Sequence, residues 1–150
     1  MALKIPPLLL MVLFMLLAWL LASLLPDAVG VLPLQRQFSL LLALIGVTVC
    51  GAGVIRFRLL GTTMNPVNLA ATSRLVTDGI YRFSRNPMYL GFLLLLVAWS
   101  LYLQPFLVLL APPAFVLYMN RFQIRFEEQA LVARFGDVYV DYRQRVRRWL

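Results

Sequence analysis

The stretch NPMYLGFLLLLVAWSLYLQPFLVLLAPPAFVLYMN, residues 86–120, contains no charged residue. A helix needs about 20 apolar residues to cross the hydrocarbon core of a membrane. This run is therefore long enough for two short helices, with Gln104-Pro105 as the turn between them. Pro87 suits the first turn of a helix, where its missing amide hydrogen costs nothing. Pro112-Pro113 fall in the middle of the second helix and predict a kink or break there.

Two further charge-free runs, Ile5–Pro26 and Gln37–Ile55, each fit one membrane-spanning helix. The first is too long for the apolar part of a signal peptide, about 7–15 residues, and predicts an uncleaved anchor. Charged residues make up 13% of the chain, against about 25% in soluble domains. We therefore expect an all-α, polytopic membrane helix bundle that forms one domain, residues 1–150. Its four transmembrane helices are predicted at about 6–25, 38–55, 88–103 and 105–120.

The basic residues are distributed very unevenly around these four helices. Thirteen of the fourteen lie before the first helix, between the second and third, or after the fourth, and only Arg36 lies on the opposite side. The positive-inside rule places the richer side in the cytoplasm. We expect both termini, a loop at 56–87 and a tail at 121–150 on the cytoplasmic side. The expected membrane is the inner membrane of a bacterium. Membrane lipids with anionic head groups are the expected partner of this surface, and nucleic acid is not.

The loop and the tail also contain signals for local structure. Gly61-Thr62-Thr63 and Asn65-Pro66 form turns, and Asp78-Gly79 marks another. Apolar residues recur between these turns, so we expect the loop to lie on the membrane surface and to pack on the tail. The tail predicts a helix from about Arg121 to Phe135, a break at Gly136, and an amphipathic helix from about Asp137. The chain has no histidine and a single cysteine, Cys50, which excludes a His/Cys zinc site.

Glu127-Glu128 is the most informative pair of polar residues. At 100° per residue, both glutamates share a helix face with Ile124, Leu131 and Phe135. Two adjacent carboxylates on an apolar face are costly unless they are paired with other groups. They therefore indicate a functional site, or else they neutralise nearby arginines such as Arg125 and Arg134.

A second group of candidates lies in LVTDGIY, residues 75–81, and RNPMYLG, residues 85–91. Gly79 and Gly91 permit close backbone approach, Tyr81 and Tyr89 suit the two faces of an adenine, and Arg85 suits a carboxylate. The alternative is that these are the arginines, tyrosines and glycines usual at membrane interfaces and helix contacts. Gly51-Ala52-Gly53 is a third candidate, although small residues within a span more often allow helices to touch.

These motifs resemble the signature of the isoprenylcysteine carboxyl methyltransferase family. The resemblance rests on Leu75-Val76-x-x-Gly79-x-Tyr81, on Arg85-Asn86-Pro87-Met88-Tyr89-x-Gly91, and on the run that begins Glu127-Glu128 and continues through Leu131, Phe135-Gly136, Tyr139 and Tyr142. The phospholipid methyltransferases are similar. The resemblance covers roughly residues 61–149 and leaves the first two helices without a specific match. It departs from the family at Asn86, where the family commonly has histidine; asparagine forms hydrogen bonds but does not titrate near neutral pH.

The resemblance implies S-adenosylmethionine as the cofactor and assigns roles to the candidate residues. Glu127 or Glu128 would accept from its ammonium or ribose, Arg85 would bind its carboxylate, and these three are the expected catalytic residues. Tyr81 and Tyr89 would pack on the adenine, and the backbone of Leu75 and Val76 would bond its edge. The full set of expected cofactor-binding residues is Leu75, Val76, Gly79, Tyr81, Arg85, Asn86, Pro87, Tyr89, Gly91, Glu127 and Glu128.

The substrate implied by the resemblance is a lipid or a prenylated molecule. A carboxylate acceptor is already ionised at neutral pH, whereas an amine must first lose a proton. With no histidine and one lysine, the chain favours a carboxylate or another acceptor that is easily deprotonated, and a glutamate acting as base leaves an amine open. Three alternatives are a phospholipid N-methyltransferase, a membrane reductase of the sterol type that uses NADPH, and a non-catalytic membrane scaffold. The oligomeric state is left open.

Overall fold

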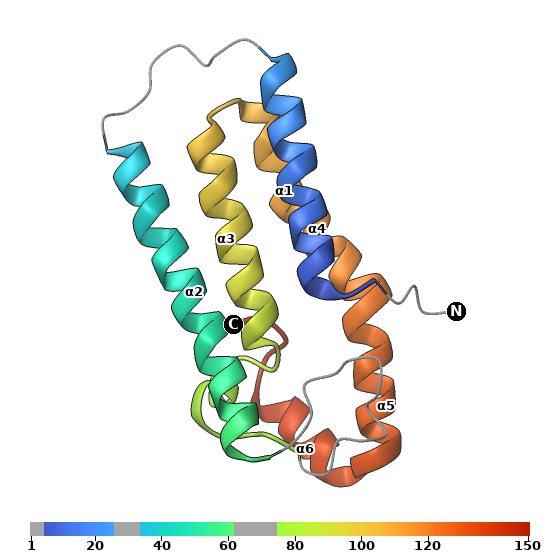
Figure 1. Ribbon diagram of the computed structural model, residues 1–150. Coiled ribbons are helices and arrows are strands. Elements are labelled where there is room, and N and C mark those ends of the chain that lie inside the picture. Colours follow the sequence, from blue (N-terminus) through green and yellow to red (C-terminus); the bar gives the residue numbers. More distant parts are fainter. Residues whose placement is uncertain (1–4, 26–33, 62–74) are drawn as a thin grey trace.

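The computed structural model describes residues 5–25, 34–61 and 75–150, and the described parts are helical with no strand. The long helices run side by side along most of the molecule (Figure 1). The elements in chain order are α1 (Pro7–Leu24), α2 (Gln35–Leu59), η2 (Gly79–Arg82), α3 (Pro87–Leu103), η3 (Phe106–Leu110), α4 (Ala111–Tyr118), η4 (Met119–Ile124), α5 (Arg125–Phe135) and α6 (Asp137–Arg145).

Helix α3 is the centre of the bundle. It lies between α2 on one side and the pair α1 and α4 on the other (Figure 1), and it contacts all three. The core is formed by Leu96 of α3, Phe115 of α4, and Met119 and Ile124 of η4, all completely buried. Leu10 and Met11 of α1 close this core from the outside. The fold is thus the all-α helix bundle that the charge-free runs predict.

Within residues 5–25, 34–61 and 75–150, three helical segments are long and apolar enough to cross a membrane. They are α1, α2 and the continuous helical segment Phe106–Phe135, and the 17-residue α3 is a shorter apolar helix. Many large apolar side chains on their outer faces are exposed, among them Leu16, Leu17, Leu40 and Leu44. Apolar surface of this extent is what lipid tails cover in a membrane protein.

The contact between α2 and α3 depends on glycine. A Cβ added to Gly91 would lie 2.7 Å from both the Cβ of Cys50 and the carbonyl oxygen of Gly46. A Cβ at Gly53 would lie 2.8 Å from the Met88 side chain, whereas one at Gly51 would meet nothing within 4 Å. Small residues that let two backbones approach are a common basis of helix association in membranes.

The helix boundaries confirm some predictions and correct others. Helix α3 begins at Pro87, and Gln104, with a φ of 78°, ends it at the predicted turn. Helix α2 is longer at both ends than the predicted 38–55, because Arg36, Arg56 and Arg58 continue the helix and their long side chains reach past the apolar zone. The prolines at 112 and 113 lie in the first turn of α4 and follow the 3₁₀ helix η3. The interruption that these prolines predict is therefore present as a change from a 3₁₀ helix to an α-helix.

The fourth span continues into the tail without a break. Residues Met119–Ile124 form a π-helical turn, which the sequence does not predict, and α5 follows directly. The predicted break at Gly136 is confirmed: its φ of +54° belongs to the region that favours glycine, and α6 begins at Asp137.

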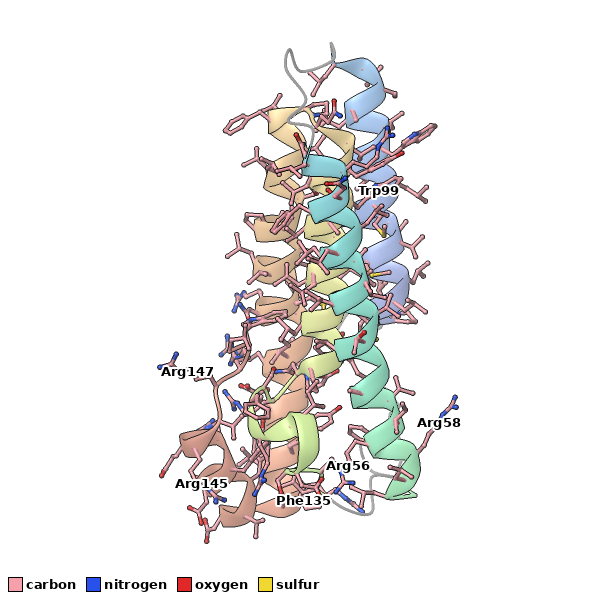
Figure 2. All side chains as sticks on the ribbon, turned by 90° about the vertical axis from the view of Figure 1, so that its left-hand side faces the viewer. Arg56, Arg58, Trp99, Phe135, Arg145 and Arg147 are labelled. Carbon is pink, nitrogen blue, oxygen red and sulfur yellow. The ribbon has the colours of Figure 1, made fainter. Side chains whose placement is uncertain are left out.

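Charged side chains gather at one end of the bundle. Figure 2 shows Arg56, Arg58, Arg145 and Arg147 toward that end and Trp99 toward the other. Arg36 lies near Trp99's end, with its guanidinium 5.8 Å from the ring centre of Tyr102, which itself stacks on Trp99. The separation of Arg36 from the other arginines thus agrees with the charge pattern of the sequence.

Candidate active site

A cluster of buried charges lies where the start of α3 meets α5 and the end of the chain. Its centre is Glu128, whose side chain is 10% exposed. Arg148 donates from Nε to Glu128 Oε1 at 3.0 Å and from Nη2 to Oε2 at 2.6 Å. Arg85 approaches the same carboxylate, with Nη1 3.1 Å from Oε1. One buried carboxylate therefore faces two guanidinium groups.

Arg85 is the less completely paired of the two arginines. Its side chain is also 10% exposed, and within the described residues its buried Nε and Nη1 have no hydrogen-bond partner. The short contact of Nη1 with Glu128 is therefore an ion pair without hydrogen-bond alignment. Tyr139 of α6 lies beside this pair: burial raises its pKa, and the neighbouring Arg85 opposes that rise. Buried guanidinium donors without partners are costly, which indicates an anionic ligand.

Glu127 points toward the start of α3. Its Oε1 accepts a hydrogen bond from the Tyr89 hydroxyl at 2.7 Å and another from Gln123 Nε2 at 2.5 Å. The two neighbouring glutamates thus have different partners, since Glu127 contacts neutral donors and Glu128 contacts arginines. Neither points away from the bundle as a simple surface carboxylate would.

The cluster is closed by residues 146–150, which we call the strap. It follows α6 and runs back beside the start of α3. The Arg147 carbonyl accepts from the Arg85 amide at 3.0 Å, and the Arg148 carbonyl accepts from Asn86 Nδ2 at 3.0 Å. On the other side, Trp149 Nε1 donates to Asn120 Oδ1 at 3.1 Å. The strap is thereby bonded both to the segment before α3 and to η4.

The segment before α3 packs on α6, as the sequence predicts for the loop and tail. The Tyr142 hydroxyl donates to the Tyr81 carbonyl at 2.7 Å, and the Tyr81 ring meets Phe57 of α2 edge-on. Arg56 of α2 forms a two-pronged pair with Asp78, and Gly79, with a φ of +59°, turns the chain beside it. The earlier part of this loop, residues 62–74, lies outside the described residues.

The expected site residues fall into two groups. Arg85, Asn86 and Glu128 share one set of contacts through Arg148, and Tyr89 and Glu127 share a second set next to it, since Glu127 and Glu128 are neighbours in α5. Pro87 starts the helix that carries Tyr89. The others lie around these contacts: Val76 and Tyr81 are buried, Leu75 is half-buried, and Gly79 faces Arg56. Gly91 lies against α2, where it serves helix packing. Glu128 is paired with Arg85 and Arg148, not with Arg125 or Arg134.

Residues in these contacts that were not among the candidates include Ser84, Asn120, Gln123, Arg148 and Trp149. A signal for two of them exists in the sequence. Asn120 and Gln123 precede Glu127 by seven and four residues, which is the spacing of one face of an α-helix. The sequence pattern places Trp149 among the apolar positions of the amphipathic helix predicted from about Asp137, and Arg148 among its arginines. In the structure α6 ends at Arg145, so both residues follow the helix.

The family model described as phospholipid methyltransferase matches residues 34–138. This chain belongs to that family. The match begins at α2, earlier than the resemblance in the motifs alone indicates, and it ends before the strap.

Several curated proteins are also similar. An uncharacterised protein of Haemophilus influenzae is 51% identical over 63 residues, which are 42% of this chain and all of that protein. Protein-S-isoprenylcysteine O-methyltransferase A of Arabidopsis thaliana is 32% identical over 117 residues, 73% of this chain and 56% of the relative. Protein-S-isoprenylcysteine O-methyltransferase B of the same plant is 41% identical over 80 residues, 49% of this chain and 37% of the relative. No solved structure matches.

The chain thus spans about a third to just over half the length of these two plant methyltransferases. Asn86 is the position at which the motif departs from the resemblance. Its side chain donates to the Arg148 carbonyl, and its backbone amide donates to Ser84 Oγ at 3.1 Å. In this chain position 86 therefore fastens the strap through an amide, which does not titrate.

Proposed function

We propose that this protein transfers a methyl group from S-adenosylmethionine to a lipid-like or prenylated acceptor, and that the accepting atom is a carboxylate oxygen. The observation that carries the proposal is the buried Arg85: it contacts Glu128, and its Nε and Nη1 have no hydrogen-bond partner among the described residues. Glu127 is the neighbour of Glu128 in α5. Membership of the phospholipid methyltransferase family supports the same chemistry.

The residues present fit the donor. S-adenosylmethionine supplies an activated methyl group on a sulfonium and also carries a carboxylate, an ammonium and a ribose. Arg85 suits the carboxylate, because its Nε and Nη1 are buried and unpaired within the described chain. Glu127 suits the ammonium or the ribose hydroxyls, because Tyr89 and Gln123 hold it in place without neutralising its charge. Tyr81, Tyr89 and the backbone of Leu75 and Val76 remain the proposed surroundings of the adenine.

The acceptor fits the apolar surroundings of this network. The cluster lies at the end of a bundle whose outer faces are leucine-rich, so an apolar tail can lie against these faces while its polar head meets the donor. A carboxylate acceptor is already ionised. Its oxygen would attack the methyl carbon while the carbon–sulfur bond breaks and its electron pair stays on sulfur. Such a displacement needs no base, and the protein contributes mainly position and orientation.

The charge pattern supports a cytoplasmic site, with both termini on the same side. The donor would then arrive from the cytoplasm, and the substrate from the lipid. The inner membrane of a bacterium is the proposed location.

The experiment is transfer of labelled methyl from S-adenosylmethionine by purified protein in lipid vesicles. Two acceptors are compared, an N-acetyl farnesylcysteine and phosphatidylethanolamine. The proposal expects a lipid-soluble label on the prenylcysteine that mild base releases as volatile methanol, as from a methyl ester. Arg85→Gln abolishes the transfer, whereas Arg82→Gln, in the exposed Arg82 of η2, retains it. A base-stable label on phosphatidylethanolamine alone would contradict the carboxylate assignment, and no label with either acceptor would contradict the proposed activity.

A further inference from the structure

Arg148 lies outside the motifs and outside the residues that the family model matches, 34–138, yet it is the closest partner of Glu128. Its guanidinium contacts both carboxylate oxygens, at 3.0 and 2.6 Å, and its Nη1 also donates to Asn120 Oδ1 at 3.3 Å. A two-pronged pair of this kind is the strongest geometry available to arginine and carboxylate. Arg148 therefore satisfies most of the charge of Glu128 by itself.

The consequence falls on Arg85. Since Arg148 occupies both oxygens of Glu128, Arg85 makes only one contact with this carboxylate, without hydrogen-bond alignment. Arg85 and Arg148 carry two positive charges against the single negative charge of Glu128, so the cluster of these three residues has an excess of positive charge. This excess positive charge, together with the Arg85 donors that have no partner among the described residues, favours binding of an external anion.

We propose that Arg148 is a positioning residue: by holding Glu128, it keeps Arg85 available for the carboxylate of the methyl donor. This inference rests on the proposed function. Without Arg148, the nearest cation to Glu128 is Arg85, and the two side chains would form the two-pronged pair themselves. The donors of Arg85 would then be satisfied within the protein, and the anion site would be lost.

The strap makes Arg148 suitable for this role. Its backbone is fixed on one side by Asn86, which donates to the Arg148 carbonyl, and on the other by Trp149, which donates to Asn120. The position of its guanidinium therefore does not depend on Glu128 alone. Lysine at this position would reach one oxygen at a time and would hold Glu128 less completely.

The neighbouring Arg147 provides a matched control. It belongs to the same strap and carries the same charge, but its side chain is exposed and points away from the bundle (Figure 2). Only its backbone takes part in the network, through the hydrogen bond from the Arg85 amide. Arg147→Met thus removes an equal charge from the same segment without touching Glu128.

The test compares two ligands, S-adenosylmethionine and decarboxylated S-adenosylmethionine, which keeps the ammonium and the sulfonium but lacks the carboxylate. Affinities are measured by calorimetry for the full-length protein in detergent. A charge-assisted hydrogen bond contributes about 1.5–3 kcal/mol, so the wild type should prefer the carboxylate-bearing ligand by about 10- to 100-fold. Arg147→Met should keep this preference. Arg148→Met should reduce it toward 1, with the affinity for the decarboxylated ligand within about 2-fold of wild type.

Three outcomes contradict the inference. The first is that Arg148→Met keeps the wild-type preference, and the second is that it weakens the binding of both ligands equally, as loss of a merely structural residue would. If Arg148→Met does not fold, Arg148→Lys serves instead, and a preference equal to wild type would overturn the inference there. Failure of the wild type to bind either ligand is a separate result, because it contradicts the proposed function itself.

Discussion

At the scale of single residues, the candidate site is organised around one carboxylate, that of Glu128. Glu128 is buried between Arg85 and Arg148, and each of these cations is partly desolvated. Such a pair adds little stability over an apolar core, but removing one partner leaves buried charge without compensation. Glu128 therefore determines both the stability of this end of the bundle and the arrangement of the site.

A substitution at this residue gives the first prediction. Glu128→Gln keeps the shape of the side chain but leaves Arg85 and Arg148 facing each other without a carboxylate. We expect a loss of about 2–3 kcal/mol in the free energy of unfolding, at the lower end of the range for buried pairs because Arg148 is about one-third exposed. Thermal unfolding in detergent measures this loss. Asp141→Asn, in an exposed residue of α6, is the control, and equal midpoints for the two variants would contradict the prediction.

A second residue-scale prediction concerns Glu127. Tyr89→Phe removes the hydroxyl that donates to Glu127 at 2.7 Å and leaves the aromatic ring in place. A hydrogen bond to a charged group contributes about 1.5–3 kcal/mol, so methyl transfer should fall by about 10-fold or more if Glu127 must be held in position. Tyr118→Phe, whose ring packs on Phe122, is the control in the same assay. Undiminished transfer by Tyr89→Phe would show that this hydrogen bond is not needed.

The sequence predicts some of these residues and not others. Glu127 and Glu128 stand out because carboxylates on an apolar helix face need partners, and Arg85 stands out within a motif. Arg148 does not, because it is one of several arginines in the predicted amphipathic helix, whereas in the structure it follows α6 in the strap. Its 20-residue separation from Glu128 is visible only in the fold.

At the scale of elements, the helices follow from the charge-free runs, and their irregularities do not. The π-helical turn at Met119–Ile124 places one extra residue in the turn between α4 and α5. An extra residue rotates the following helix by about 100° relative to a regular one, which changes the face that α5 presents to α3. Hydropathy contains no signal for this change, so the partners of Glu127 and Glu128 could not be assigned before the fold was known.

The contact between α2 and α3 gives the prediction at this scale. Gly91→Ala places a Cβ 2.7 Å from the Cβ of Cys50 and from the Gly46 carbonyl oxygen, so the helices must separate. Overpacking of this kind costs about 1–3 kcal/mol. The unfolding midpoint in detergent should fall accordingly. Gly51→Ala, where a Cβ meets nothing within 4 Å, should leave it unchanged or higher. Equal destabilisation by both substitutions would count against the close contact.

At the scale of the whole molecule, composition and charge predict the class of fold and its polarity. The bundle separates Arg36 from Arg56, Arg58 and the arginines of α6, as the sequence indicates. What the sequence does not determine is the lateral order of the helices, because every apolar face is a possible partner for another. The central place of α3 follows from glycine contacts and core packing that only the structure reveals.

The orientation of the bundle can be tested directly. In a Cys50→Ala background, Arg145→Cys and Phe106→Cys introduce single thiols at exposed positions near opposite ends. The positive-inside rule predicts that a membrane-impermeant maleimide labels Phe106→Cys in intact bacterial cells. It should label Arg145→Cys only after the cells are permeabilised. The reverse pattern would contradict the proposed cytoplasmic site.

We propose that the residues around Arg85, Glu127 and Glu128 together bind a methyl donor. The most direct measurement is calorimetric titration of the purified protein with S-adenosylmethionine and, in parallel, with NADPH. We predict one donor molecule bound per chain, a loss of about 10- to 100-fold in affinity for Arg85→Gln, and no binding of NADPH. Binding of NADPH in place of S-adenosylmethionine, or donor affinity that Arg85→Gln leaves unchanged, would contradict the claim.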